Sequence, residues 1–324
     1  MLQPETQTLL ESLKPLVETE MGWLLRLPYH EDGGQLYPFV WDASEQGAFS
    51  PWNLLQAEGW CHTATLDATL ESWSLPDRSG SINGETWLLP SEDEAGLLLD
   101  AATKSERLSH YQALADWLKA NLQDLQAYRL SCVGEQSSDP YAALIVVGQV
   151  AGQAADNVWL SIAPSIAHAT PERDFPFCVN WVAASPSPAV SLPLESQLQS
   201  FLAQLGSIQV YGYYGGGYNQ THEHKFLYAV GRSRAAAIEQ VLLAAGGLET
   251  KIFDGFAPKT SVDAERQKIA KLEQFLHQNF SQLRLDRICF WNQEHFYISG
   301  SPHAEAPTGD RVGVVLRSRF TYNP

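Results

Sequence analysis

Apolar residues recur at the spacing of an amphipathic helix in two widely separated segments. In residues 9–17 (LLESLKPLV) and 194–205 (LESQLQSFLAQL), they fall three or four positions apart, which predicts helices with one buried face. A glycine, Gly22 or Gly206, follows each segment and can end its helix in the left-handed conformation. The chain is therefore expected to begin the same order of elements twice.

Short runs of aromatic and β-branched residues follow each of these helices and predict strands. They are WLLRL (23–27), YPFVW (37–41) and TATLD (63–67) in the first half, and IQVYGY (208–213), KFLYAV (225–230) and TKIFD (250–254) in the second. A long second helix is expected in each half, over residues 106–123 and 264–280, because leucines and aromatic residues again lie three and four apart.

The two halves also match residue by residue, which indicates an internal repeat. An offset of 184 relates Leu10-Glu11-Ser12 to residues 194–196, an offset of 187 relates Phe39 to Phe226 and Asp67 to Asp254, and an offset of 158 relates Asn121 to Asn279 and Arg129 to Arg287. The change of offset indicates an insertion in the middle of the first copy. Each copy then ends in two apolar strands, the first of which stops near Gly148 or Gly300.

The repeat predicts two similar α/β/α sandwich domains of the α+β class, each with a mainly antiparallel sheet flanked by helices. The expected domains are residues 1–165 and 194–324, and residues 166–193 are expected to form a connector rich in proline, serine and alanine. Within the connector, DFPFCVNWV (174–182) has the composition of one more strand for the first copy.

The charge of the chain narrows the kinds of partner. The formal net charge is −16, and residues 1–165 hold 23 acidic and 7 basic residues, whereas residues 166–324 hold 14 of each. This acidity opposes direct binding of nucleic acid and favours a protein partner with a basic surface. No stretch reaches the roughly 18 apolar residues of a membrane span, and the start lacks the features of a signal peptide, so we expect a cytoplasmic protein.

Several segments resemble the nuclease A inhibitor family. In the first copy they are LLESLKPLVETEMGWLL, YPFVWD, LADWLKANLQDLQAYRLS and LIVVGQVAGQAADNVWLSI; in the second they are QFLHQNFSQLRLDRICF, HFYISGSP and VGVVLR. Members of this family are small cyanobacterial proteins that block a metal-dependent, sugar-nonspecific endonuclease. The resemblance implies a tandem of two inhibitor-like domains that binds a nuclease and is not itself an enzyme.

The resemblance also implies a contact residue. The family uses an acidic residue, in the loop between the first strand and the YPF-type strand, to approach the divalent metal of the enzyme. Here that loop is PYHEDGGQLYPF (28–39), and its carboxylates are Glu31 and Asp32. The loop carries extra residues relative to the family, so either carboxylate can be the equivalent one. A carboxylate can take the place of the scissile phosphate beside a hard cation.

Aromatic residues provide a second set of candidate partner contacts. Trp41, Trp52 and Trp60 crowd a short segment, where they either contact a protein partner or pack locally over the sheet edge. At the place of the acidic loop, the second copy has Tyr213, Tyr214 and Tyr218 around three glycines. Because one loop is acidic and the other aromatic, we expect them to touch different protein surfaces.

The glycine-rich loop is not predicted to bind a small ligand. It lacks the Lys-Ser/Thr pair of a phosphate-binding loop. His222 and His224 share a strand face, but a metal site would need a third ligand such as His295 or His303. Asp67 and Asp254 are expected to cap turns or accept backbone hydrogen bonds, and four scattered cysteines without a CxxC pair indicate neither a zinc site nor a disulfide framework. We therefore predict no cofactor, no bound metal and no catalytic residue.

Two functions fit these observations. The first is a non-enzymatic protein-binding protein that inhibits a metal-dependent nuclease. The second is a scaffold, chaperone or assembly factor that has reused the duplicated fold, for instance for a photosynthetic or carbon-fixation complex.

Overall fold

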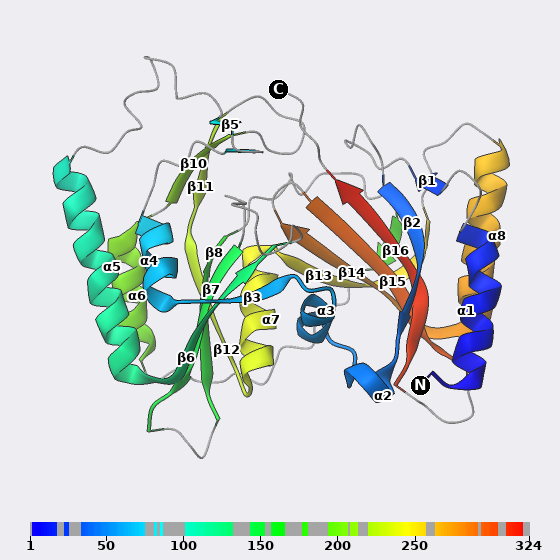
Figure 1. Ribbon diagram of the computed structural model, residues 1–324, viewed down its shortest axis with the longest axis horizontal. Coiled ribbons are helices and arrows are strands. Elements are labelled where there is room, and N and C mark those ends of the chain that lie inside the picture. The colour runs from blue at the N-terminus through cyan, green and yellow to red at the C-terminus, as the bar shows by residue number, and fades with distance from the viewer. Residues whose placement is uncertain are drawn as a thin grey trace. The chain divides into compact units, whose positions relative to one another are not determined.

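The protein belongs to the α+β class, as the sequence predicts. The computed structural model describes residues 2–17, 23–25, 34–74, 81–82, 85–86, 101–131, 143–152, 157–165, 177–180, 194–206, 208–212, 220–256, 263–290, 293–303 and 309–319 (Figure 1). The chain divides into two compact units, and each is built from segments of both halves.

Unit 1 consists of Met1–Ala57, Ala169–Ser185 and Leu248–Pro324. Its antiparallel sheet has the order β1-β2-β16-β15-β14-β13-β9. These strands are β1 (Trp23–Leu25), β2 (Gly34–Trp41), β9 (Phe177–Asn180), β13 (Leu248–Phe256), β14 (Phe280–Phe290), β15 (Gln293–Pro302) and β16 (Arg311–Arg319). Helices α1 (Pro4–Val17) and α8 (Asp263–Asn279) lie side by side on one face of this sheet (Figure 1). Two short helices, α2 (Ala43–Gln46) and α3 (Pro51–Ala57), follow β2.

Unit 2 consists of Glu58–His168 and Pro186–Gly247. Its antiparallel sheet has the order β12-β8-β7-β6-β3, in strands β3 (Cys61–Ala64), β6 (Leu122–Leu130), β7 (Ala143–Val150), β8 (Trp159–Pro164) and β12 (Phe226–Gly231). Helices α4 (Leu66–Ser74), α5 (Ala101–Asn121) and α6 (Glu195–Leu205) enclose a core on one face, and α7 (Arg234–Ala245) packs on β7, β8 and β12. Two small hairpins, β4 (Ser81–Ile82) with β5 (Glu85–Thr86) and β10 (Ile208–Gly212) with β11 (Gln220–His224), complete the unit.

The two halves of the chain exchange their first helix and strand. Strand β2, from the first half, pairs with β16, from the end of the chain, over Trp41↔Arg311 to Gly34↔Ser318. Reciprocally, β12 from the second half pairs with β8 from the first, over Phe226↔Pro164 to Gly231↔Trp159. Each sheet is therefore completed by an edge segment that belongs to the other half.

This exchange differs from the expected boundaries at residues 165 and 194. The compact units combine residues from both sides of those boundaries, and the expected connector contains β9, which pairs with β13 rather than with the first copy. The physical reason is that an amphipathic strand and helix fit any sheet of the same topology. Local pattern therefore predicts the elements and leaves open which sheet they join.

The repeat itself is clearest where the long helix meets the next strand. Asn121 and Asn279 each end their helix, and each Nδ2 donates to the carbonyl oxygen four residues earlier, at 2.8 Å. Three residues later, Asp124 and Gln282 have φ of 47° and 51°, and the strand pairing shifts register there in both copies. These features agree with the offset of 158.

The match between Phe39 and Phe226 is wrong by three residues. Phe39 lies opposite Gly313, whereas Phe226 lies opposite Pro164, and the repeat makes Ser161 the equivalent of Gly313. An odd shift turns a strand residue to the other face. Accordingly, Phe226 packs on Trp73 and Tyr111 in the helix-covered core, at ring distances of 5.0 and 5.9 Å. Phe39 instead packs on Phe49 and Tyr297, at 6.2 and 5.1 Å.

A predicted strand also proved shorter than expected, and one helix was missed with it. The run TATLD leaves the sheet after Ala64, because the Thr65 hydroxyl accepts a hydrogen bond from Ala68 N–H (3.1 Å) and starts helix α4. Asp67 therefore lies in the first turn of a helix, where it accepts a bond from Lys119 Nζ at 3.1 Å. Its counterpart, Asp254, stays within strand β13.

Candidate binding surfaces

The acidic segment connects two paired strands at the edge of the unit 1 sheet. Strands β1 and β2 pair over Trp23↔Leu36 and Leu25↔Gly34, and β1 is the outermost strand. Glu31 and Asp32 belong to the intervening residues 26–33, which are outside the described residues. The paired ends thus make this segment the connection of a β-hairpin.

The tyrosine-rich segment occupies the same kind of position in unit 2. Strands β10 and β11 pair antiparallel from Ile208↔His224 to Gly212↔Gln220. Tyr213, Tyr214 and Tyr218 belong to the intervening residues 213–219, which the structure does not describe. The two segments that the sequence analysis matched therefore both connect hairpin strands that follow the first helix of a copy.

The three tryptophans are buried rather than displayed. Trp41, Trp52 and Trp60 are 1%, 6% and 7% exposed. The Trp41 ring meets Phe49 edge to face at 5.3 Å, and its Nε1–H donates to the Gly47 carbonyl oxygen at 2.8 Å. The structure therefore favours local packing over partner contact for these residues.

The histidines that were considered as metal ligands lie on separate elements. His222 and His224 are on β11, opposite Val210 and Ile208, whereas His295 is buried on β15 and His303 follows that strand. Within the described ranges, no group of three or more His, Cys, Asp or Glu side chains is placed to hold a metal ion.

The two cysteines whose side chains are described are free thiols. Cys61 is half-buried and Cys289 is buried. Burial raises the pKa of the Cys61 thiol to about 11, so it stays protonated and weakly nucleophilic at neutral pH.

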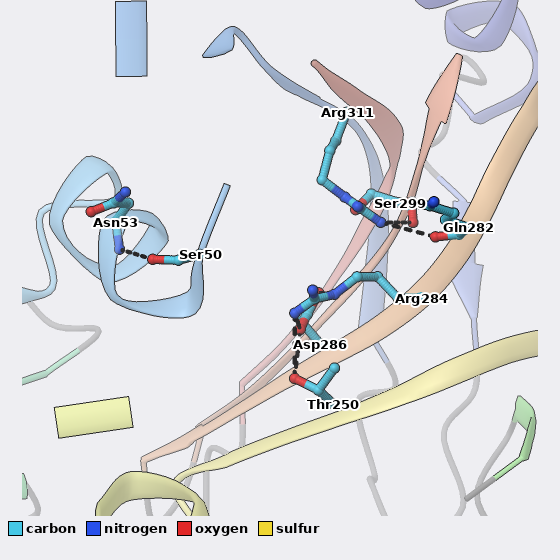
Figure 2. Close-up of polar contacts among 8 residues, drawn as sticks. All are labelled: Ser50, Asn53, Thr250, Gln282, Arg284, Asp286, Ser299 and Arg311. Atoms are coloured by element: carbon cyan, nitrogen blue, oxygen red, sulfur yellow. Dashed lines mark hydrogen bonds and ion pairs between the residues drawn. The ribbon is translucent and has the colours of Figure 1, made fainter. Parts of the chain in front are cut away.

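A cluster of charged and aromatic side chains, which the sequence analysis did not single out, occupies the face of the unit 1 sheet opposite α1 and α8. Arg284 and Asp286 alternate on β14 and so share this face, as Figure 2 shows. Arg284 Nε–H donates to Asp286 Oδ2 at 2.6 Å, and its Nη2 also contacts Asp286 Oδ1. The Thr250 hydroxyl donates to Asp286 Oδ1 at 2.8 Å. The carboxylate, 1% exposed, is thus fully engaged.

Arg311 reaches the same face from β16 but makes a different set of bonds. Its Nε–H donates to Ser299 Oγ at 3.0 Å, and its Nη2 donates to the carbonyl oxygens of Ser299 (2.7 Å) and Gln282 (3.1 Å) (Figure 2). The residue is 8% exposed. Burial, together with repulsion from Arg284 and despite attraction to Asp286, lowers the pKa of the Arg311 guanidinium to about 10.

The ring of Phe49 lies against both guanidinium groups. The Cζ atoms of Arg284 and Arg311 are 5.3 and 5.1 Å from its centroid, within the range of cation–π attraction. Phe49 lies between α2 and α3. Next to it, Ser50 Oγ accepts a hydrogen bond from Asn53 N–H at 3.2 Å (Figure 2), and Asn53 Nδ2 donates to the Ala48 carbonyl oxygen at 2.8 Å. We call Arg284, Arg311, Asp286 and Phe49 the arginine cluster.

The sequence held a weak signal for this cluster. Arg284 and Asp286 are two apart in the sequence, so they share a face once the segment is a strand. The neighbouring Arg287, which the repeat matches to Arg129, points to the opposite face and pairs with Glu249 at 3.6 Å. Arg311 could not have been joined to Arg284 without the pairings β14–β15 and β15–β16.

Comparison with known proteins assigns no family. No family model matches the sequence, and neither a curated protein nor a solved structure is significantly similar to the chain. Among the described helices, none combines the length and the apolar character needed to cross a membrane.

Proposed function

We propose that this chain is a non-enzymatic protein-binding protein, and most concretely an inhibitor of a basic, metal-dependent nuclease. The observation that carries the proposal is the hairpin β1–β2, whose paired ends at Leu25 and Gly34 make the segment with Glu31 and Asp32 a connection at the edge of a sheet. A carboxylate presented in this way can approach a divalent cation in an enzyme cleft.

The distribution of charge supports an electrostatically guided encounter. Regrouped by compact unit, the chain has 13 basic and 19 acidic residues in unit 1, and 8 basic and 18 acidic residues in unit 2, which gives net charges of −6 and −10. The two sequence halves differ strongly in net charge, whereas both compact units are acidic. Acidic surfaces accelerate association with a basic nucleic-acid-binding cleft.

Titration into a nuclease A-type digestion tests the proposal. The wild-type protein is expected to suppress DNA cleavage at micromolar excess, and Glu31→Ala/Asp32→Ala is expected to weaken inhibition by at least tenfold, on the order of 1.4 kcal/mol. The matched control is Glu106→Ala/Asp116→Ala, which removes two exposed carboxylates from α5 and the same net charge. Undiminished cleavage with the wild type, or equal weakening by both double variants, would contradict the proposal.

The hairpin β10–β11 favours a second candidate, a scaffold or assembly factor. It carries three tyrosines where the first hairpin carries carboxylates, and aromatic side chains are common anchors of protein interfaces. A duplicated fold with two dissimilar hairpins can hold two partners in one complex.

Affinity purification from the native cell separates the two candidates. For an assembly factor, we expect the wild type to retain a defined protein other than a nuclease, and Tyr213→Ser/Tyr214→Ser/Tyr218→Ser to lose most of it, while Glu31→Ala/Asp32→Ala keeps it. Quantitative mass spectrometry of the retained proteins measures both effects. Retention that is the same for the wild type and the tyrosine variant would refute a role for the second hairpin.

A further inference from the structure

The arginine cluster carries one positive charge that no carboxylate of the described residues pairs with directly. Asp286 forms its ion pair with Arg284. Arg311 donates only to the hydroxyl and carbonyl oxygens of Ser299 and to the carbonyl of Gln282, and no carboxylate among the described residues forms an ion pair with it. A buried guanidinium without an ionic partner is costly, because its charge loses hydration without a compensating counter-charge.

The fold does not require charge at these positions, as the other copy of the repeat shows. The repeat offsets place Gln126 at the position of Arg284, Tyr128 at that of Asp286, Val147 at that of Ser299 and Trp159 at that of Arg311. In unit 2, helix α7 covers this face, and Val147 is fully buried. The same sheet is therefore stable without a charged cluster, so a reason other than folding is needed for the one in unit 1.

The geometry places two guanidinium groups beside one aromatic ring. Both guanidinium groups contact the same aromatic ring, at 5.3 and 5.1 Å from its centroid, and their charges repel each other. The Arg284 side chain is 28% exposed and Phe49 is half-buried, so solvent reaches part of the cluster. An anion bound between the two arginines would relieve their repulsion and accept hydrogen bonds from planar, fixed donors.

We propose that Arg284 and Arg311, over the ring of Phe49, form a binding site for an oxyanion, the phosphate or carboxylate group of a ligand or partner. Asp286 holds Arg284 in place from the buried side, and Ser299 with Gln282 holds Arg311. The site lies apart from the Glu31/Asp32 hairpin in sequence and has the opposite charge preference, so it recognises acidic groups while the hairpin recognises a basic cleft.

Isothermal titration calorimetry of the full-length protein tests this site with two probes, inorganic phosphate and glutarate, at constant ionic strength. We expect saturable binding of at least one probe at one site per chain. Tighter binding of phosphate would identify a phosphorylated group as the ligand, and tighter binding of glutarate a carboxylate. Absence of saturable heat with both probes overturns the proposal.

Two variants of the cluster and one control variant test whether the measured anion binding occurs at the cluster. Arg311→Met removes the uncompensated charge, keeps the apolar length of the side chain, and is expected to weaken binding at least tenfold. Arg284→Lys retains the charge beside Asp286 but loses the forked donor geometry, and several-fold weakening is expected. Arg266→Gln, at an exposed arginine of α8, is the control and should bind like the wild type.

Stability separates a binding role from a structural one. If the cluster binds an anion, Arg311→Met and Arg284→Lys remain folded by circular dichroism and lose affinity. If Arg311→Met does not fold, Arg284→Lys decides the question. Unchanged affinity in every folded variant of the cluster would place the binding elsewhere and refute the proposed site.

Discussion

Residues 186–324, expressed alone, will not form a folded monomer, although they contain all of the expected second domain. In the structure, their strands β13 to β16 need β2 at the edge and α1 on the face, and both come from the first 41 residues. Without them, the core loses Leu13, Val17 and Leu36, each fully buried. At about 1.5–3 kcal/mol for each side chain, the loss is roughly 5–9 kcal/mol, which is comparable with the whole stability of an ordinary domain.

Mixing the two fragments provides the decisive measurement. Residues 1–185 supply α1, β2 and β9 to unit 1, and residues 186–324 supply α6, β12 and α7 to unit 2. We therefore expect the mixed fragments to elute as a 1:1 complex in size-exclusion chromatography. The complex should unfold cooperatively in urea, whereas neither fragment should do so as an isolated monomer. A monomeric 186–324 fragment that unfolds cooperatively near the midpoint of the intact protein would show that the strand exchange is dispensable. A folded homodimer of that fragment would show β12 taking the place of β2.

Gly300→Ala is expected to destabilise the protein by about 3 kcal/mol, at the upper end of the usual cost of overpacking. A Cβ at this position would lie 2.7 Å from the Ser281 carbonyl oxygen and 2.8 Å from Phe280 Cβ. Neither atom can move freely, because both belong to the residues that join α8 to β14. The equivalent Gly148 faces Leu122 Cβ at 2.9 Å and the Gln123 carbonyl oxygen at 3.2 Å, so Gly148→Ala should have a similar but smaller effect.

Gly59→Ala is the matched control for these two substitutions. Gly59 has φ of 70°, and a Cβ there would meet nothing within 4 Å. Its expected cost is about 1 kcal/mol, from the left-handed backbone alone. If close packing between the strand and the helix junction dominates, urea denaturation should show the largest loss of unfolding free energy for Gly300→Ala, a smaller loss for Gly148→Ala and the smallest for Gly59→Ala. A smaller loss for Gly300→Ala than for Gly59→Ala would contradict that explanation.

Much of the fold could be predicted because its helices and strands follow from the local pattern of apolar and polar residues. The helices over 106–123 and 264–280 were predicted within a few residues of α5 and α8, since their periodicity extends over several turns. The offset of 158 was confirmed down to the side-chain bonds of Asn121 and Asn279. Helix α7 was not predicted, because it is apolar on nearly all sides and gives little periodic signal, although Ser233 caps its start and Gly246 its end.

Some features of the candidate sites could be predicted from the sequence, and others needed the tertiary structure. Residues 26–33 and 213–219 each connect two strands that pair antiparallel, so the two segments occupy matching places in their copies. The functions of Glu31, Asp32 and the three tyrosines stay predictions. The tryptophans were ambiguous from sequence, because a residue in a short helix or at a strand end can face either the core or solvent. The arginine cluster as a whole could not be predicted, because its members come from β14, β16 and the segment before α3.

The sequence by itself determined the duplication, the first and the long helix of each copy, and the match of the two copies at the end of the long helix, because each depends on contacts between residues close in the chain. Only the tertiary structure decided that β2 joins β16 and β12 joins β8, since the local pattern of an edge strand does not specify which of two similar sheets it joins. That choice redistributes the net charge between the units and brings Phe49 from the first half onto Arg284 and Arg311 from the second.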